Sequence, residues 1–204
     1  MNLIDHFNDW TKTYDSDVIS MKVGYPFEGY EFVLDFVERE INISNETKIL
    51  DLGIGTGTLT ERLYKKGAKI VGVDFSSKMI EVAKSKMPTA TFLCQNLNDV
   101  LPEKYDSDTF DYIISTYAIH HLEDNEKINL LNSLYQKLST NGVILIADIS
   151  FEHLNDMTEV KNCTKNWDED EFYIVYEEFK NMLQMPSKYK QLSICAGILK
   201  IEKR

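Results

Sequence analysis

A glycine-rich turn between an apolar run and a leucine-containing stretch is the feature that most constrains this fold. The segment KILDLGIGTGTLTERL, residues 48–63, passes through Gly53, Gly55 and Gly57 and then places Leu59 and Leu63 at helical spacing. Glycine tolerates the backbone conformations that a tight strand-to-helix turn requires. We therefore predict a strand, a tight loop and a helix in succession, an arrangement that often cradles a nucleotide.

Short apolar runs alternate with helical patterns along the rest of the chain. Runs that are apolar on both faces indicate strands of a covered parallel sheet, and they are KILDL (48–52), KIVGVD (69–74), TFLC (91–94), FDYIIST (110–116) and VILIADI (143–149). Helices are predicted after the glycine turn up to Gly67, over 79–87 behind the N-cap Ser76, and over 128–138 with Asn141 and Gly142 closing it. Two further helical patterns, over 4–18 and 30–41, precede the sheet.

This alternation predicts an α/β fold. We expect a Rossmann-like, doubly wound and mostly parallel sheet, with its first five strands in the usual order 3-2-1-4-5 and an N-terminal helical cap. The expected parts of a single domain, 1–204, are a helical cap (1–44), an α/β core (45–150), a helical insertion (151–187) and a C-terminal strand or hairpin (188–204). Ligands bind such sheets beyond the carboxyl ends of the strands, where the strand order switches. The glycine loop and the segment STYAIHHL, 115–122, are therefore expected to face one crevice.

Composition excludes several classes of function. The chain has 204 residues and a formal net charge of −11, whereas nucleic-acid binders usually concentrate Lys and Arg on one surface. No apolar stretch is long enough to span a bilayer, and residues 1–20 lack the pattern of a signal peptide. The three cysteines form no CxxC pair, so we expect reduced thiols and no metal site. These features predict a cytoplasmic monomer or homodimer without nucleic-acid or membrane partners.

The spacing of the glycines distinguishes among the known kinds of glycine-rich nucleotide-binding loop. A GxGxxG dinucleotide fingerprint would place its third glycine where this chain has Thr58, and the GK[ST] of a P-loop is absent. The motif DLGIGTG, with Asp51 two residues before Gly53, instead resembles motif I of the class I S-adenosylmethionine (SAM) dependent methyltransferases. The following strand and turn, KIVGVDFSSKMIEVA, are similar to motif II of that family and end the strand at Asp74.

The resemblance implies a seven-stranded sheet in the order 3-2-1-4-5-7-6. It also implies SAM as the cofactor and assigns its nucleoside half to the first strands. It implies that Asp74 accepts hydrogen bonds from two ribose hydroxyls and that Phe75 and Met79 pack on the adenine; the alternatives are a helix cap and ordinary core packing. The segment FLCQNLNDVLP lies where the family has a Gly-Asp pair before Leu-Pro. Here Asn96, followed by Leu97, stands in place of the aspartate, so its carbonyl would accept from the adenine amino group without the charge.

The methionine half of the cofactor is assigned to two other segments. FDYIISTYAIHHLED resembles the family's fourth strand and the loop after it, which implies that the main chain around Ser115 holds the methionine ammonium and that His120 and His121 lie near the transferred methyl. Either histidine could take a proton from an acceptor that must lose one; the alternative is a histidine hydrogen-bonded to backbone. FxxWxxxYD, residues 7–15, resembles the N-terminal helix of small bacterial methyltransferases and places Tyr14 over the cofactor, unless that helix only packs on the core.

The predicted activity is SAM-dependent methyl transfer to a small-molecule acceptor by in-line displacement. His120 and His121 are the predicted catalytic residues, and the predicted cofactor-binding residues are Tyr14, Asp51, Gly53, Gly55, Gly57, Asp74, Phe75, Met79, Asn96, Leu97 and Ser115. The aromatic residues of the insertion, Trp167, Phe172, Tyr173 and Tyr176, either wall an acceptor pocket or pack as core. Two alternatives remain: a module that binds SAM or S-adenosylhomocysteine without turnover, and a nicotinamide-dependent reductase, which the early third glycine disfavours.

Overall fold

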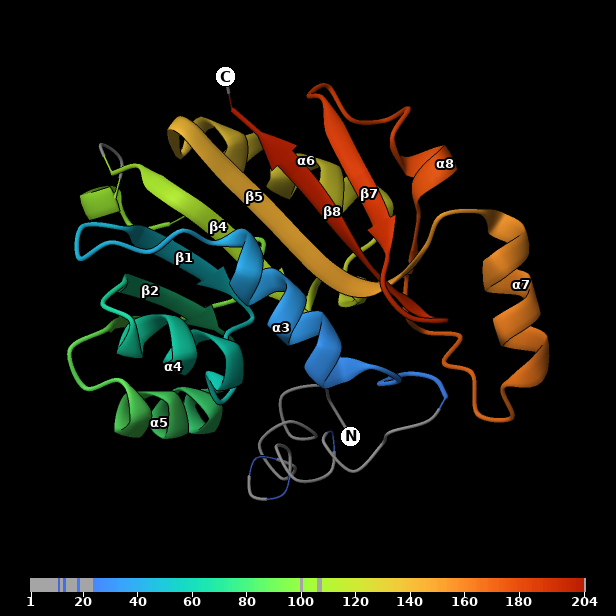
Figure 1. Ribbon diagram of the computed structural model, residues 1–204, viewed down its shortest axis with the longest axis horizontal. Helices are drawn as coiled ribbons and strands as arrows, with labels where there is room; N and C mark the ends of the chain where they lie inside the picture. Colours follow the sequence, from blue (N-terminus) through green and yellow to red (C-terminus); the bar gives the residue numbers. More distant parts are fainter. Residues whose placement is uncertain are drawn as a thin grey trace.

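The strands pair into one mostly parallel sheet. The computed structural model describes residues 24–99, 101–105 and 108–203, together with Thr11, Thr13 and Val18. The strand order is β3-β2-β1-β4-β5-β8-β7, with the short β6 beside β5 (Figure 1). The strands are β1 (Lys48–Leu52), β2 (Lys69–Asp74), β3 (Thr91–Cys94), β4 (Phe110–Thr116), β5 (Leu138–Phe151), β6 (Ile174–Val175), β7 (Ser187–Gln191) and β8 (Ala196–Glu202). The predicted α/β class and strand order are confirmed, since β8 and β7 take the places of the seventh and sixth strands.

The pairing brings the carboxyl ends of the central strands together. Strand β1 runs parallel to both β2 and β4, with Asp51 opposite Gly72 on one side and Ile114 on the other. Strands β7 and β8 form an antiparallel hairpin, and β8 also pairs antiparallel with β5. The C-terminal segment is therefore a hairpin rather than a single strand. The order of the strands switches at β1, whose two neighbours lead to opposite edges of the sheet.

Helices cover both faces of this sheet. They are α3 (Tyr30–Glu40), α4 (Thr58–Lys65), α5 (Ser77–Lys86), α6 (Asp124–Gln136), α7 (Leu154–Cys163) and α8 (Tyr176–Phe179), with 3-10 turns η1 (Glu103–Tyr105) and η2 (Ile119–His121). Helices α3, α4 and α5 lie on one side of the sheet and α6 lies on the other (Figure 1). None of the helices in the described ranges is long and apolar enough to cross a membrane.

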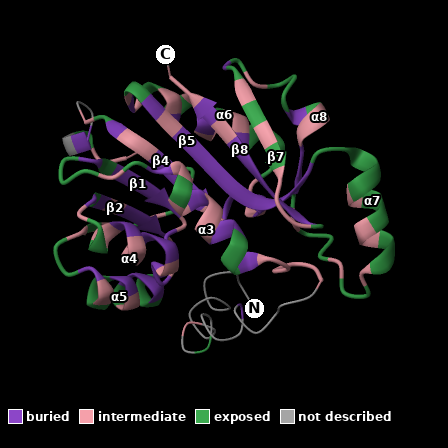
Figure 2. Ribbon diagram, in the orientation of Figure 1, coloured by how far each residue is buried: buried purple, intermediate pink, exposed green. Residues whose placement is uncertain are grey.

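Alternate residues of the central strands supply two separate apolar cores. In β5, Ile144 and Ile146 pack in the core beneath α6, whereas Leu145 and Ala147 pack in the core beneath α3 and α4. Successive strand residues point to opposite faces, so a sheet covered on both sides needs apolar residues at nearly every position. Figure 2 shows the consequence: the central strands are buried, whereas α7 has no buried residue.

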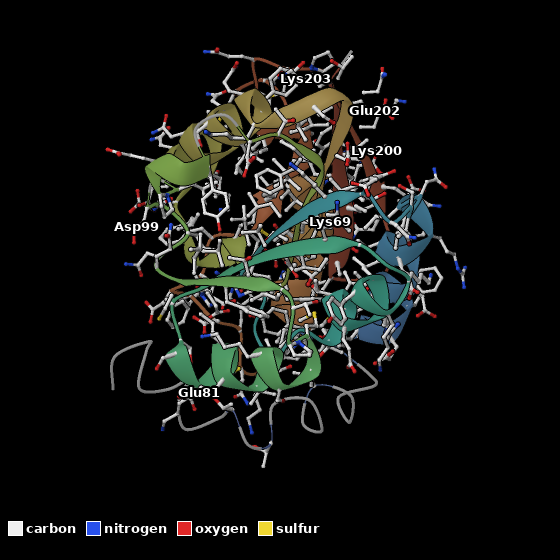
Figure 3. The ribbon with its side chains drawn as sticks, turned by 90° about the vertical axis from the view of Figure 1, so that its left-hand side faces the viewer. Lys69, Glu81, Asp99, Lys200, Glu202 and Lys203 are labelled. Atoms are coloured by element: carbon white, nitrogen blue, oxygen red, sulfur yellow. The ribbon has the colours of Figure 1, made fainter. Side chains whose placement is uncertain are left out.

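Local signals in the sequence fix the ends of α5. The Ser76 hydroxyl accepts a hydrogen bond from the Met79 N–H at 3.2 Å, which confirms the predicted N-cap. The helix ends at Lys86, two residues before Pro88. Glu81, on the solvent side of α5, points away from the sheet (Figure 3).

The predicted extent of the helix over 128–138 is wrong at its end. Helix α6 ends at Gln136, Leu138 opens β5, and Asn141 (φ 65°) lies within that strand. Leu138 pairs with Phe110 of β4, and the Phe110 N–H donates to the Lys137 carbonyl. A leucine at helical spacing is equally suited to a buried strand, so periodicity alone could not locate this boundary.

Ion pairs on the surface contribute little to the stability of the fold. Lys200 of β8 lies 3.0 Å from Glu40 of α3 and 3.1 Å from Glu202, and Lys200 and Glu202 lie at or near the carboxyl end of β8, between β5 and β7. Exposed pairs of this kind contribute only about 0–1 kcal/mol each. The two apolar cores therefore supply most of the stability.

Gly53 gives the first prediction, because it joins the glycine loop to the segment after β4. Its φ is +71°, and a Cβ there would lie 2.3 Å from the Ala118 Cβ. Gly24 has a similar φ of +84°, but a Cβ would meet nothing within 4 Å. Gly24→Ala should therefore lower the free energy of unfolding by roughly 1–2 kcal/mol, the cost of a left-handed backbone for an L-residue. Gly53→Ala should lower it by roughly 1–3 kcal/mol more, through overpacking.

Urea unfolding of both variants measures this difference. Equal losses in the two variants would show that the loop accommodates the added methyl by moving, and that Gly53 does not fix its distance to Ala118.

Candidate active site

A cavity of about 360 Å³ lies at the carboxyl ends of β1, β2 and β4. We call it the crevice cavity, and its lining residues are Gly53, Gly55, Asp74, Phe75, Met79, Asn96, Leu97, Asn98, Asp99, Ala118, His121 and Leu122. It lies where the strand order switches, which is where open α/β sheets bind their ligands. Most of the predicted cofactor-binding residues therefore meet at one cavity, although they come from three separate loops.

The glycine loop is anchored to β2 and leaves its middle glycine facing open space. The N–H groups of Gly53 and Ile54 donate to the Val73 carbonyl at 2.8 and 3.0 Å. A Cβ on Gly55 would meet nothing within 4 Å, whereas one on Gly57 would lie 2.6 Å from the Met87 Cε. Gly55 thus lines the cavity, while Gly57 lets α4 pack closely on the residue after α5. A contact between Gly57 and the cofactor stays a prediction.

The Asp74 carboxylate joins the first two loops of the site. It is buried; Oδ2 accepts from the Gly55 N–H and Oδ1 from the Ser76 N–H, both at 2.8 Å. Burial raises the pKa of this carboxyl, and the backbone hydrogen bonds from Ser76, Gly55 and Phe75 oppose the rise. The two carboxylate oxygens together offer about four acceptor positions, and three backbone N–H groups occupy three of them, so capacity for a ligand in the cavity remains. The ribose role of Asp74 stays a prediction that this geometry permits.

Asp51 is a buried acid, and one of its two carboxylate oxygens lacks a hydrogen-bond partner among the described residues. Its Oδ2 accepts from the Thr60 hydroxyl, and among the described residues its Oδ1 has no hydrogen-bond partner. Burial, with a smaller contribution from the charge of Asp74, raises its pKa to about 7 against the opposing Thr60 hydrogen bond. Asp51 lines a small cavity of about 20 Å³ together with Gly53, Gly55 and other residues of the loop. An unpartnered buried carboxylate favours either a proton or a cationic ligand group.

Ser115 holds two strands together. Its side chain is fully buried, and its hydroxyl donates to the Leu52 carbonyl at 2.7 Å. Its neighbour Thr116 lines the small cavity beside Asp51, and Ala118 lines the crevice cavity. The predicted contact between the main chain near Ser115 and the methionine ammonium stays a prediction. Tyr14, and the helix predicted over 4–18, lie outside the residues that the structure describes, apart from Thr11, Thr13 and Val18.

The two predicted catalytic histidines occupy different environments. His120 is buried, and its Nδ1 lies 2.6 Å from Asp148 Oδ1. Asp148 Oδ2 accepts from the N–H groups of Ala118, Ile119 and His120 at 3.2, 2.9 and 3.1 Å. His121 lines the crevice cavity, and His120 lies behind it. Asp148 therefore fixes the turn that presents His121.

The His120–Asp148 pair is a charge pair in which each partner shifts the other. Burial by itself lowers the pKa of His120, but the nearby carboxylates of Asp148 and Glu171 outweigh burial and the pKa is raised. Burial by itself raises the pKa of Asp148, but His120 outweighs it and the pKa is lowered. Both directions favour the imidazolium–carboxylate form in the unliganded protein.

Glu171 joins the histidines from the insertion between β5 and β7. Its Oε1 lies 3.4 Å from His120 Nε2 and 3.8 Å from His121 Nδ1, and its Oε2 accepts from the Tyr173 hydroxyl at 2.7 Å. The adjacent Phe172 N–H donates to the His120 carbonyl at 2.8 Å. The insertion is thus bonded directly to the turn that carries both histidines.

The sequence signalled Asp148 but not Glu171. Asp148 interrupts an otherwise apolar strand, VILIADI, and a buried charge requires a partner. Glu171 is one of four consecutive acids in WDEDE, and the sequence does not show which of them turns inward. Both residues were absent from the predicted site.

A groove of about 280 Å³ lies on the insertion side of Glu171. We call it the insertion groove; it is lined by Asp124, Leu154, Met157, Lys161, Trp167, Asp168, Glu169, Glu171, Tyr173, Val175 and Glu178. Trp167 stacks on Tyr25 at 4.8 Å between ring centroids and meets Tyr173 edge-on at 4.9 Å. Two of the predicted aromatic residues therefore wall a groove. Tyr176 instead stacks on Tyr189, and Phe172 is exposed.

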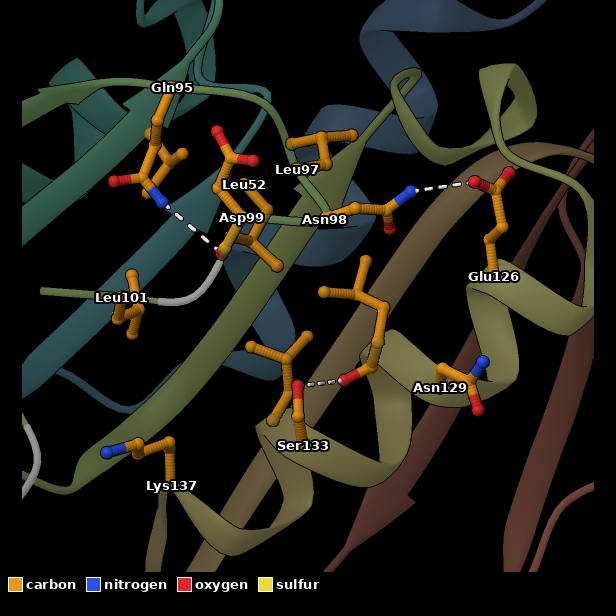
Figure 4. Close-up of a pocket in the computed structure, with 13 residues that line it drawn as sticks. Leu52, Gln95, Leu97, Asn98, Asp99, Leu101, Glu126, Asn129, Ser133 and Lys137 are labelled. Carbon is orange, nitrogen blue, oxygen red and sulfur yellow. Dashed lines mark hydrogen bonds between the residues drawn. The ribbon is translucent and has the colours of Figure 1, made fainter.

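A third cavity, of about 440 Å³, lies between the loop after β3 and α6. It shares Leu97, Asn98 and Asp99 with the crevice cavity. Figure 4 shows the Asn98 amide donating to Glu126 of α6, at 3.0 Å. The loop that carries Asn96 and Leu97 thus separates two cavities and is tied to α6 by an exposed hydrogen bond.

Comparison with known proteins identifies the family. The family model described as a methyltransferase domain matches residues 49–142. An uncharacterized methyltransferase of Oceanobacillus iheyensis is 34% identical over 151 residues, covering 73% of this chain and 68% of the relative. Another, of Alkaliphilus oremlandii, is 33% identical over 176 residues, covering 85% and 78%. The chain belongs to the class I SAM-dependent methyltransferase family.

Solved structures agree with this fold. The DhpI complex with S-adenosylhomocysteine aligns with a TM-score of 0.70 at 15% identity, over 97% of this chain and 93% of that one. Magnesium protoporphyrin IX methyltransferase from Synechocystis, with bound S-adenosylhomocysteine, aligns with a TM-score of 0.68 at 14% identity, over 98% and 99%. At these identities the likeness shows the fold alone.

Asp51 gives the second prediction, a pH dependence of cofactor binding. Because its pKa is about 7 in the unliganded protein, the carboxyl must lose its proton to pair with a cationic group. The affinity for SAM should therefore rise as the pH passes from below to above 7 and then level off. Asp51→Asn should bind SAM more weakly at high pH and lose this dependence. Calorimetric titration at several pH values, with proton release read from buffers of different ionisation enthalpy, measures both effects.

The stability of the unliganded protein should respond to the same group with the opposite sign. The folded pKa of about 7 exceeds the ordinary value of 3.8, so ionisation of Asp51 opposes folding. The stability that the protonated Asp51 carboxyl contributes is fully present below the unfolded pKa. It is lost as the pH rises through the folded pKa. An Asp51→Asn variant with the same pH profile as the parent, in binding and in stability, would contradict the assignment.

Proposed function

We propose that this protein transfers a methyl group from SAM to a small-molecule acceptor, with SAM seated in the crevice cavity. The single observation that carries the proposal is the convergence of the glycine loop, Asp74 and the pair Phe75 and Met79 on one cavity. A ribose-binding carboxylate, an apolar slot for a base and a backbone that a ligand can approach closely are the three elements that a nucleoside cofactor requires.

Two features in and beside the crevice cavity fit SAM in particular. The Oδ1 atom of Asp51 is buried and, within the described residues, has no partner, and SAM carries positive charge on its sulfonium and its ammonium. Gly55 leaves open space where any side chain would enter the cavity. The charge fits a cationic ligand, and the space admits it beside the loop.

The proposed seat of each part of the cofactor follows from the lining. The Asp74 carboxylate faces the ribose, Phe75 and the buried Met79 enclose the adenine, and the loop carrying Asn96 and Leu97 contacts its edge. Gly53 and Gly55 lie along the methionine portion, with Asp51 near its charge. Gly57 and Ser115 support this seat through α4 and through the bond between β4 and β1.

Methyl transfer depends on alignment of the acceptor with the methyl group of SAM and requires no covalent intermediate with the protein. When bound, SAM supplies an electrophilic methyl group that moves by in-line displacement. Holding an acceptor at near-attack distance and in line can supply roughly 7–11 kcal/mol of the barrier in favourable systems. The task of this chain's residues is therefore to seat both molecules and to exclude water from the crevice.

The acceptor side of the proposal rests on His121 and the insertion. His121 lines the crevice cavity and Glu171, close to it, lines the insertion groove. We assign the acceptor to this side, with residues 151–187 as the acceptor-binding segment and His121 as the catalytic candidate that faces it. His120, whose ring nitrogens face Asp148 and Glu171, is assigned to hold His121 in place.

A cytoplasmic location is part of the proposal. Cys94, Cys163 and Cys195 are all free thiols, as is usual in a reducing compartment.

Asp74→Asn tests the ribose assignment. The amide keeps the shape of the side chain but removes the charge, and hydrogen bonds to a charged group are worth roughly 1.5–3 kcal/mol. SAM affinity should fall by roughly 10- to 100-fold. The matched control is Asp111→Asn, since Asp111 also accepts from a backbone N–H, that of Lys48 at 2.9 Å, but lies far from the crevice. Calorimetry with S-adenosylhomocysteine on both variants gives the comparison; equal affinities would remove the assignment.

Gly55→Val tests the function as a whole. The new side chain should fill the crevice cavity and abolish SAM binding and methyl transfer, while circular dichroism shows a folded protein. Gly24→Val is the control, because Gly24 has φ +84° and also has nothing within 4 Å of an added Cβ. Turnover is measured with methyl-labelled SAM against a panel of hydroxyl, amine, thiol and carboxylate acceptors.

Three results would contradict the proposal in different ways. Tight SAM binding by Gly55→Val would place the cofactor elsewhere. Binding of NADH instead of SAM by the parent protein would indicate the reductase. SAM binding without label transfer to any acceptor class would indicate a binding module.

A further inference from the structure

We propose that His120, His121 and Glu171 form a binding site for one divalent transition-metal ion, of which zinc is the representative. Each residue offers one ligand atom, and the three atoms lie within 4.8 Å of one another. Glu171 Oε1 lies 3.4 Å from His120 Nε2 and 3.8 Å from His121 Nδ1. A tetrahedral zinc ion binds such donors at about 2.0–2.2 Å, which places two of its ligand atoms roughly 3.4 Å apart. The His120–Glu171 pair already has this spacing, and a rotation of the partly buried His121 ring toward the other two ligands would close the site.

The donor set matches a metal of this class. Two imidazole nitrogens and one carboxylate oxygen suit zinc and its neighbours in the first transition row, whereas magnesium and calcium prefer oxygen alone. Three protein ligands leave at least one coordination position for water or substrate, as in catalytic zinc sites. Among the residues that the structure describes, this is the single group of three such side chains close enough to hold an ion.

Outer partners hold two of the three ligands in the orientation that a metal needs. A metal-binding histidine usually donates its other ring N–H to a carboxylate, which fixes the tautomer. His120 Nδ1 lies 2.6 Å from Asp148 Oδ1, so donation there, with release of the Nε2 proton as the ion binds, leaves the Nε2 lone pair directed toward Glu171. The second oxygen of Glu171 accepts from the Tyr173 hydroxyl at 2.7 Å. Each of these ligands thus has one atom held and one atom facing the site.

The segment that brings Glu171 to the histidines is itself fixed. The Phe172 N–H donates to the His120 carbonyl at 2.8 Å, and the Phe172 carbonyl accepts from Lys127 Nζ at 2.6 Å. Lys127 is fully buried and also donates to Asp124 at 3.0 Å. By contrast, His153 and Glu177 lie 2.8 Å apart in an exposed pair that no third ligand joins among the described residues. The first arrangement is preorganised for an ion, and the second is a surface ion pair.

The position of the site defines the class of acceptor that it would recognise. His121 lines the crevice cavity and Glu171 lines the insertion groove, so the ion would lie between the two. Its open positions would take an oxygen donor, such as a hydroxyl or carboxylate of the acceptor, and a cation lowers the pKa of a coordinated hydroxyl. This role rests on the proposed function, whereas the binding of the ion does not. Glu171 is far from the histidines along the chain, so the site could not be predicted from the sequence.

Zinc titration of the metal-free full-length protein tests the site. Cys94 and Cys163 are exposed thiols that could bind zinc, so the titration uses a Cys94→Ser, Cys163→Ser background. Calorimetry and elemental analysis after gel filtration should give one zinc per chain. Cobalt substituted for zinc should give the absorption bands of a low-coordinate nitrogen and oxygen site.

Variants separate the site from other zinc binding. His121→Ala and Glu171→Gln change side chains that are 20% and 18% exposed, and each should weaken zinc binding by at least ~100-fold. Tyr173→Phe removes only an outer partner and should weaken zinc binding less, by roughly 10- to 100-fold. His153→Ala and Glu177→Gln are the matched controls and should leave the affinity unchanged. Circular dichroism of each variant confirms that it is folded.

The opposing outcomes are distinct. Failure of the background protein to bind one zinc, or equal affinity in the His121→Ala, Glu171→Gln and control variants, would overturn the site and leave His120 as an imidazolium between two carboxylates. S-adenosylhomocysteine binding is measured on the same samples. Zinc binding without S-adenosylhomocysteine binding would reject the proposed function and keep the metal site, and the reverse result would reject the metal site alone.

Discussion

The Asp148 carboxylate is the contact on which the geometry of the site depends. It is buried at the end of the central strand β5, where one oxygen accepts from three consecutive backbone N–H groups of the turn after β4 and the other faces the His120 ring. A buried carboxylate is tolerable only when such donors surround it. The same bonds that satisfy its charge therefore fix the turn, and with it the position of His121 beside the crevice.

On the other side of the crevice, a second buried carboxylate also fixes backbone segments through hydrogen bonds from their N–H groups. Asp74 closes β2 and accepts from Gly55 on the glycine loop and from Ser76 at the start of α5. Two acids at or near the carboxyl ends of two parallel strands thus each bind a loop that follows a different strand. Asp51, on β1 between these strands, keeps its Oδ1 atom without a hydrogen-bond partner within the described part of the chain. A cationic group of the cofactor would pair with this carboxylate.

Much of the fold could be predicted because its signals are local. The alternation of apolar runs and helical patterns predicted the doubly wound sheet, the family resemblance implied its full strand order, and Ser76 was correctly predicted to cap α5. The boundary at Leu138 was wrong, because an apolar residue there suits a helix and a buried strand equally well and pairing with Phe110 decides between them. The half of the site formed by Gly53, Asp74 and Phe75 was predictable, since Asp74 ends a recognisable strand and Gly53 and Phe75 each directly follow one.

What the sequence by itself determined is therefore the sheet, its carboxyl edge and the residues that stand on that edge, because strand and turn preferences act over a few neighbouring residues. Only the tertiary structure decided which acids meet the histidines. Asp148 reaches His120 through the parallel pairing of β4 and β5, and Glu171 reaches it through the backbone bond from Phe172. In WDEDE the four acids are alike in sequence, and Glu171 turns inward because the fold places the Tyr173 hydroxyl and the buried His120 ring opposite it.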